Sequence, residues 1–312
     1  MPLDFRVIGL ATPDQRALRA AIWEVPEGQP RRGTCVLLQG FTEFIEKYDE
    51  VAGELLARGF TVVSLDWRGQ GASERRGYGT RRGHVASFDE YEHDLAILLN
   101  QTVARMEPAP VIALAHSMGG HILLRYLHDH HRRFVCAVLT APMLEVDTGK
   151  YSPLVTSMLA LFFNLRRPST RFVFGAEERD PLTLPFEENR VTSDRARYLR
   201  TQDILKARPY LAINGPTFGW LHAALKSMRR LRGRRFAEEI TTPLLVFGAG
   251  KDRVVHTQAV RDFVKRLPNA RYVEFENSEH EILMENDSIR ARFWSEFDSF
   301  VEFYVPRGPV SS

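Results

Sequence analysis

The sequence predicts an α/β protein with a mostly parallel, eight-stranded sheet flanked by helices and a helical insertion before the last two strands. Eight short, apolar, β-rich runs recur along the chain, amphipathic helical segments separate many of them, and the alternation stops between about residues 144 and 240. Strands that alternate with helices through right-handed crossovers form a parallel sheet. The eight runs are RVIGL, LRAAIWEV, TCVLLQG, FTVVSLD, PVIALAHS, FVCAVLTAP, PLLVFGAG and RYVEFENS.

The first two runs differ from the rest in how they are connected. Only a short segment joins residues 6–10 to residues 18–25, which predicts an antiparallel hairpin at one edge of the sheet. From residue 34 onward the runs are almost continuously hydrophobic, as strands covered by helices on both faces should be. We therefore expect the hairpin at an edge and the later strands in the interior.

Two intervening segments carry clear helix signals. KYDEVAGELLARG places Val51 and Leu55 on one face and ends at Gly59, a residue type that commonly follows the C-cap. SFDEYEHDLAILLNQTVARM begins with Ser87 as the N-cap and has Glu90 three residues later, which predicts a capping box. Both segments are expected to pack an apolar face against the sheet.

The chain is expected to divide into a core and an insertion. Residues 1–143 and 241–305 form the core, residues 144–240 form a helical cap, and residues 306–312 form a flexible tail. The cap contains 17 Lys and Arg against 11 Asp and Glu, whereas the whole chain has a net charge of +3. The cap is therefore basic and the rest of the chain is slightly acidic.

Composition excludes several classes of protein. The 312 residues are 44% hydrophobic and 26% charged, and no basic block argues for nucleic-acid binding. Cys35 and Cys136 lie inside apolar runs, so we expect reduced packing residues, with neither a disulfide nor a metal site. The N-terminus lacks the apolar core of a secretory signal, and the longest uncharged stretch, residues 151–165, is shorter than the ~20 residues that span a bilayer. A cytoplasmic location is expected.

The stretch AHSMGG, residues 115–120, has the pattern of a nucleophile elbow. Ser117 stands between a predicted strand and a predicted helix, and Gly119 and Gly120 supply the small neighbours that such a sharp turn requires. The next helix directs its N-terminal N–H groups at the site, which favours negative charge there. The usual motif has glycine two residues before the serine, where this chain has Ala115.

A nucleophilic serine needs a histidine base and an acid that orients it. Such partners follow this type of turn in the order acid, then histidine, on loops after later strands. Asp252 follows the run PLLVFGAG, and His280 follows RYVEFENS, so both occupy the expected places. The oxyanion donors are predicted to be the backbone amides of Met118, directly after the serine, and Phe41, after Gly40 in the turn that follows the third run.

With these motifs, the chain resembles the capped α/β-hydrolases that include lysophospholipase L2 and the bacterial and mammalian monoacylglycerol lipases. The resemblance runs from about Phe5 to Phe303. It is carried by AHSMGG, DWRGQGAS, RRGHVASFDEYEHDL, GAGKDRVV and SEHEILMENDSIR, and the cap segments ENRVTSDRARYLR and NGPTFGWL resemble the lysophospholipase branch more closely. The family's triad maps onto Ser117, Asp252 and His280. Gln39 stands where the family often has histidine.

The resemblance implies a serine hydrolase that cleaves carboxylic esters with one fatty acyl chain through an acyl-enzyme. A lysophospholipase is the first expectation, and a monoacylglycerol lipase or broad carboxylesterase is the alternative. Acyl transfer to an alcohol and a non-catalytic binding protein on the same fold are further alternatives. We expect a lipid or small ester substrate, no cofactor, no metal and no nucleic acid, with peripheral contact between the cap and a membrane or micelle; the oligomeric state is open.

Other residues have simpler interpretations. Glu43, Asp66 and Arg68 lie near predicted strand ends and are expected to fix loops by hydrogen bonds, and His116 is expected to pack beside the elbow. The glutamates on either side of the predicted base, Glu279 and Glu281, are expected to face away or to serve structure. The stretch HDHH, residues 128–131, is expected at a helix C-terminus. The apolar segment 154–165 is either cap packing or an acyl-chain wall or membrane-facing lip.

Overall fold

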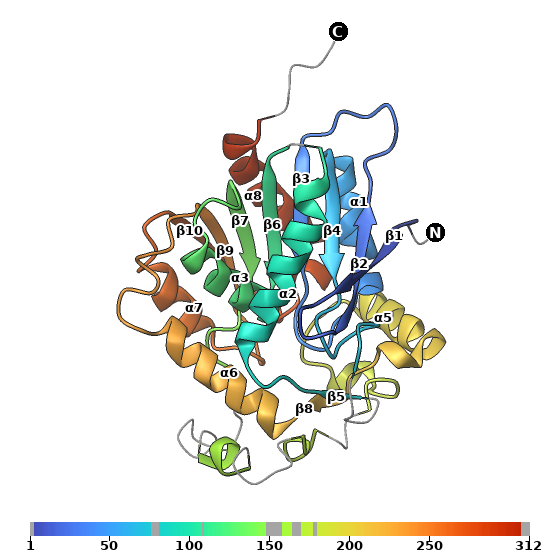
Figure 1. Cartoon of the computed structure of the whole chain (residues 1–312), viewed down its shortest axis with the longest axis vertical. Coiled ribbons are helices and arrows are strands. Elements are labelled where there is room, and N and C mark those ends of the chain that lie inside the picture. Colours follow the sequence, from blue (N-terminus) through green and yellow to red (C-terminus); the bar gives the residue numbers. More distant parts are fainter. Residues whose placement is uncertain are drawn as a thin grey trace.

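The computed structural model describes residues 3–75, 81–107, 109–147, 158–163, 170–176 and 180–306. Eight strands form one twisted sheet in the order β1-β2-β4-β3-β6-β7-β9-β10 (Figure 1). Their bounds are β1 Arg6–Ala11, β2 Ala17–Trp23, β3 Gly33–Leu38, β4 Phe60–Leu65, β6 Val111–His116, β7 Cys136–Thr140, β9 Leu244–Ala249 and β10 Ala270–Phe275. The predicted eight-stranded sheet is confirmed.

Strand directions follow the prediction. Strands β4, β3, β6, β7, β9 and β10 pair in parallel, while β1 and β2 form an antiparallel hairpin and β2 pairs antiparallel with β4. The hairpin places β1 at the edge, as its short connection predicted. Because the six parallel strands point the same way, the loops that follow them gather along one edge of the sheet.

Helices cover both faces of the sheet (Figure 1). Side chains of α2, α3 and α7 belong to one buried apolar cluster, and side chains of α1 and α8 belong to a second cluster on the opposite face. The helices are α1 Asp49–Ala57, α2 Phe88–Gln101, α3 Met118–Asp129, α5 Arg195–Ala207, α6 Phe218–Leu231, α7 Thr257–Val264 and α8 Asp287–Tyr304. Within the described part of the chain, none of these helices is long and apolar enough to cross a bilayer.

The two segments with predicted helix signals form helices with the expected ends. Ser87 caps α2 with a complete capping box that includes Glu90. Helix α1 buries Val51 and Leu55, and Gly59 follows its C-cap with φ of 81°, a left-handed conformation that glycine adopts without steric cost. The local sequence therefore determines where both helices begin or end.

The elements between β7 and β9 lie beyond the carboxyl ends of the parallel strands (Figure 1). They include the helices α5 and α6, as a helical insertion predicts. A two-residue strand, β8 (Gly215–Pro216), pairs with β5 (Arg82–Gly83) outside the main sheet. The core and cap boundaries at residues 144 and 240 remain a prediction, and residues 307–312 of the predicted tail lie outside the described residues.

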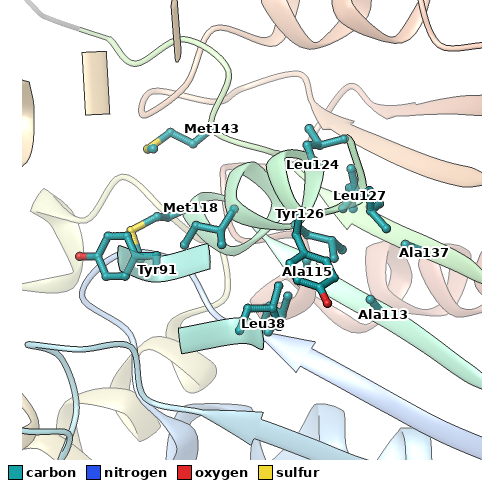
Figure 2. Close-up of a cluster of buried hydrophobic side chains, with 14 of the residues drawn as sticks. Leu38, Tyr91, Ala113, Ala115, Met118, Leu124, Tyr126, Leu127, Ala137 and Met143 are labelled. Carbon is teal, nitrogen blue, oxygen red and sulfur yellow. The ribbon is translucent and has the colours of Figure 1, made fainter. Parts of the chain in front are cut away.

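Small side chains under α3 bring this helix close to the sheet. Ala113 and Ala115 lie on β6 and Ala137 on β7, and all three belong to the cluster that contains Leu124 and Leu127 of α3 (Figure 2). Each of the three alanines is fully buried. Ala115, the departure from the usual elbow motif, therefore serves as a packing residue in the core beneath the elbow.

Candidate active site

Ser117 lies at the tip of the turn between β6 and α3. Its φ of 50° and ψ of −114° are unusual for a residue with a side chain, and such conformations cost roughly 1–3 kcal/mol. The Ser117 N–H donates to the carbonyl of Thr140 at 3.0 Å. A Cβ on Gly119 would lie 2.5 Å from the carbonyl oxygen of Leu38, so only glycine fits there. These contacts hold the serine in the strained geometry of a nucleophile elbow.

The predicted acid and base lie beside this serine. Asp252 follows β9, His280 follows β10, and both loops lie at the same edge of the sheet as the elbow. His280 Nε2 is 2.9 Å from Ser117 Oγ, and His280 Nδ1 is 2.7 Å from Asp252 Oδ2. The other carboxylate oxygen, Asp252 Oδ1, accepts hydrogen bonds from the amides of Val254 and Val255 at 2.8 and 2.9 Å. The three predicted residues therefore form one continuous hydrogen-bonded chain.

Burial and charge set the protonation of this chain. Burial alone would lower the pKa of His280, but the charge and hydrogen bond of Asp252, helped by the charges of Glu281 and Glu43, raise that pKa above its usual value. Burial would raise the pKa of Asp252, but His280 and the two backbone amides lower it. Asp252 is therefore ionised, and a proton on His280 is stabilised.

The raised pKa of His280 predicts the pH dependence of hydrolysis. A general base must be neutral to accept a proton, so kcat/KM should reach half of its maximum at a pH above 6.5, the ordinary pKa of histidine. The rate of p-nitrophenyl ester hydrolysis between about pH 5 and 9 would measure this. A half-maximum below pH 6.5 would show that burial outweighs the Asp252 charge.

The backbone amides of the two predicted oxyanion donors, Phe41 and Met118, make no hydrogen bond within the described part of the chain. The amides on either side of Phe41 are held, because Gly40 N–H donates to Glu43 Oε2 at 2.5 Å and Thr42 N–H donates to Gln70 Oε1 at 2.6 Å. The assignment of Phe41 and Met118 to an oxyanion hole stays a prediction.

Side chains fix the surroundings of the turn after β3. The Phe41 ring lies 4.1 Å from the Trp220 ring of α6, measured between centroids. Gln39, which stands where the family often has histidine, is fully buried, and its side-chain amide donates to Ser64 Oγ on β4 at 3.3 Å. The backbone carbonyl of Gln39 also accepts a hydrogen bond from Trp67 Nε1 at 3.0 Å. Gln39 therefore anchors the turn to the neighbouring strand.

The loop residues near the site have the structural roles expected of them. Asp66 accepts hydrogen bonds from the amides of Ile45 and Ala72, and Arg68 pairs with Asp94 on α2. His116 packs beside the elbow, 4.8 Å from the His280 ring between centroids, and burial lowers its pKa to about 3.

The HDHH stretch lies where it was expected. His128 is in the last turn of α3, and His130 is the C-cap of this helix. His128 also stacks on Phe236, with the ring centroids 4.2 Å apart.

Sequence reasoning missed one group of buried charges beside the site. Lys47 binds both Glu43 and Glu281 through its ammonium group, at 2.7 and 2.6 Å. The four-residue spacing between Glu43 and Lys47 suggests a local pair, but the contact with Glu281 spans 234 positions and has no local signal. Tyr48 joins the group by donating its hydroxyl to Glu43 at 2.7 Å.

The sheet order, the strained serine and the position of its partners define an α/β-hydrolase. Within this class, the chain matches the model of the family described as serine aminopeptidase, S33, over residues 29–287 and therefore belongs to that family.

Three proteins with similar sequences are named as lysophospholipases or as a monoacylglycerol lipase. The chain is 28% identical to "Probable lysophospholipase L2" of Haemophilus influenzae, over 88% of this chain and 85% of that protein. It is 30% identical to "Lysophospholipase L2" of Escherichia coli K12, over 82% and 76%, and 28% identical to "Monoacylglycerol lipase" of Mycolicibacterium smegmatis, over 79% of each. The chain is a carboxylic ester hydrolase.

A solved structure has the same fold over nearly the whole length. A soluble variant of monoglyceride lipase from Saccharomyces cerevisiae, solved with a substrate analog, aligns with a TM-score of 0.76 at 18% identity, over 98% of this chain and 96% of that one. At this identity the likeness concerns the fold. It confirms the predicted arrangement of sheet and helices.

Proposed function

We propose that this protein hydrolyses esters of lipids with a single acyl chain through a covalent acyl-enzyme formed on Ser117. The observation that carries the proposal is the chain of hydrogen bonds from Ser117 Oγ through His280 to Asp252, at 2.9 and 2.7 Å. This order of nucleophile, base and orienting acid is the one that acyl transfer to serine requires.

Each group has a distinct role in the proposed reaction. Ser117 Oγ attacks the ester carbonyl while His280 Nε2 takes its proton, and the amides of Phe41 and Met118 bind the oxygen that becomes negative. His280 then gives the proton to the leaving alcohol, so that the acyl group remains on Ser117. A water molecule, deprotonated by the same histidine, releases the fatty acid and restores the serine.

Exposed apolar side chains support a lipid substrate. Met158, Leu161, Phe162 and Phe174 are large, hydrophobic and between 45% and 65% exposed. Phe163 stacks on Phe218 of α6 with centroids 4.3 Å apart, and so connects this surface to the rest of the structure. We propose that this apolar surface contacts a membrane or micelle peripherally. In a cytoplasmic protein it would contact the inner face of the membrane. Residues 154–157, 164 and 165 of the apolar segment lie outside the described residues.

The head group proposed first is that of a lysophospholipid. The basic insertion favours an anionic interface or a substrate phosphate, and two of the relatives above are named lysophospholipases. The monoacylglycerol lipase of M. smegmatis keeps monoacylglycerol as the second candidate.

A substrate panel tests the head group. Lysophosphatidylcholine should be hydrolysed with a higher kcat/KM than a monoacylglycerol of the same acyl chain, because the basic insertion can bind the phosphate. Fatty-acid release would be measured in matched detergent. Analysis of the products formed in the presence of glycerol would detect transfer of the acyl group to an alcohol instead of to water. A preference for monoacylglycerol would overturn the choice of lysophospholipid but leave ester hydrolysis intact.

A further inference from the structure

We propose that Glu43 is a positioning residue for catalysis, and that a buried chain from Glu43 through Lys47 to Glu281 joins the oxyanion turn to the histidine loop. The oxyanion turn is residues 39–42, and the histidine loop is residues 278–285. The inference rests on the proposed function, because it assumes that Ser117 and His280 perform the chemistry. It adds a role for charged groups that do not touch the reacting atoms.

Glu43 holds the oxyanion turn directly. Its Oε2 accepts the Gly40 N–H at 2.5 Å and the Tyr48 hydroxyl at 2.7 Å. With Gln70 holding Thr42 N–H, the amides before and after Phe41 are both anchored by side chains. The Phe41 N–H lies between these anchors. Its direction therefore depends on Glu43, and oxyanion donors act only when they are directed at the developing charge.

Lys47 extends the chain to the histidine loop. Its ammonium donates to Glu43 Oε1 and to Glu281 Oε1, and all three side chains are between 5% and 11% exposed. Glu281 follows His280 directly and donates its backbone N–H to the carbonyl of Val191 at 2.7 Å. A displacement of either loop would break an ion pair in surroundings with little water, where the loss is costly. The chain therefore fixes the distance between the oxyanion donors and the base.

The charges of this chain also act on the base. Burial opposes ionisation of Glu43, but Lys47 and the neighbouring groups lower its pKa to about 2. Lys47 stays protonated because Glu281 and Glu43 outweigh the effect of burial and raise its pKa. Burial raises the pKa of Glu281, against the charge of Lys47. The chain brings two carboxyl groups and one ammonium close to His280, and the charges of Glu281 and Glu43 raise the pKa of that histidine.

Several groups influence the charge on His280. Asp252 binds it directly, Glu281 and Glu43 add negative charge, and the adjacent His116 is neutral because burial lowers its pKa to about 3. The proton that His280 takes from Ser117 creates a positive charge, which the carboxylates stabilise. Removal of one carboxylate charge should make His280 less basic.

Two effects are to be separated: the direction of the Phe41 N–H and the negative charge near His280. The variants that separate them are Glu43→Gln, Glu43→Asp and Glu281→Gln. In Glu43→Gln, kcat should fall about 10²-fold with KM changed less than about twofold, because a misdirected oxyanion donor affects the transition state. The pH of half-maximal kcat/KM should move down. Glu43→Asp keeps the charge but has a shorter reach, so kcat should fall while the half-maximal pH stays. Glu281→Gln should move that pH down with a smaller loss of kcat.

Asp94→Asn provides the matched control. Asp94 is fully buried and pairs with Arg68 at 2.6 Å, so this change also removes a buried charge. Among the described residues, the hydrogen bonds of Asp94 go to Arg68 and not to the oxyanion turn or the histidine loop. It should lower Tm without moving the half-maximal pH. If the Glu43 and Glu281 variants lower Tm but keep the wild-type kcat and half-maximal pH, the positioning role is wrong.

Active-site labelling distinguishes this result from failure of the proposed function. A fluorophosphonate probe should label Ser117 in the wild type and in every folded variant. A label on another residue of the wild type would contradict the catalytic serine itself. If Glu43→Gln does not fold, Glu281→Gln decides the question alone, because it leaves the Gly40 contact in place and removes both the charge beside His280 and its ion pair with Lys47. If kcat and the half-maximal pH both stay at their wild-type values in that variant, the proposal is overturned.

Discussion

Ser117→Ala is expected to lower kcat for a short p-nitrophenyl ester by about 10⁴- to 10⁶-fold, the range found when a nucleophilic serine is removed from a triad. Among the described residues, Ser117 is the one whose hydroxyl lies within hydrogen-bond distance of His280 Nε2, which the attacking oxygen requires. Water activated by His280 can still attack, but without forming an acyl-enzyme. Steady-state rates on purified protein would measure the loss.

Ser73→Ala is the control for the loss of a buried serine hydroxyl. Ser73 is 4% exposed and donates its hydroxyl to the Asp66 carbonyl at 2.6 Å, so the change removes a buried hydrogen bond away from the triad. It should cost stability but leave most of the activity. Circular dichroism would establish that both variants fold. A Ser117→Ala protein that keeps most of its activity would remove Ser117 as the nucleophile.

The sequence predicts the sheet well, and it singles out the candidate triad residues, because the signals for both are local. A buried parallel strand needs a continuous apolar run, and a capping box needs only Ser87 and Glu90. The elbow serine is recognisable because glycine stands two residues after it, at Gly119. A Cβ there would lie 2.5 Å from the carbonyl oxygen of Leu38. The order of acid and histidine after the serine then identifies Asp252 and His280. Each of these inferences depends on residues adjacent in sequence or on the ends of strands.

What the sequence did not predict depends on contacts between distant segments. Glu281 was expected to face away or to serve structure, and only the folded chain brings it to Lys47, 234 positions earlier. Strand β8 was also missed, because two residues are too short for a periodic pattern. Gln39 could not be interpreted without its partner Ser64 on the adjacent strand. Long-range pairing of polar side chains leaves no local pattern to read.

Asp252→Asn is expected to lower kcat by about 10⁴-fold, the effect known for the equivalent change in a serine-protease triad. The hydrogen bonds explain why the change is not conservative. Asp252 Oδ1 accepts the Val254 and Val255 amides, so an asparagine oxygen would occupy that position and its NH₂ group would face His280 Nδ1. The NH₂ group can only donate, which leaves Nδ1 as an acceptor and moves the ring proton to Nε2. Nε2 could then no longer accept the Ser117 proton.

The matched control for this change is Asp262→Asn on α7. Asp262 is exposed and pairs with Lys265 at 2.9 Å, so its loss removes one surface charge and should change kcat less than about twofold. Loss of the Asp252 charge should also lower the pKa of His280, because that carboxylate is the strongest influence that raises it. An Asp252→Asn rate within about tenfold of the wild type would mean that another group orients His280, since the wrong tautomer alone costs far more.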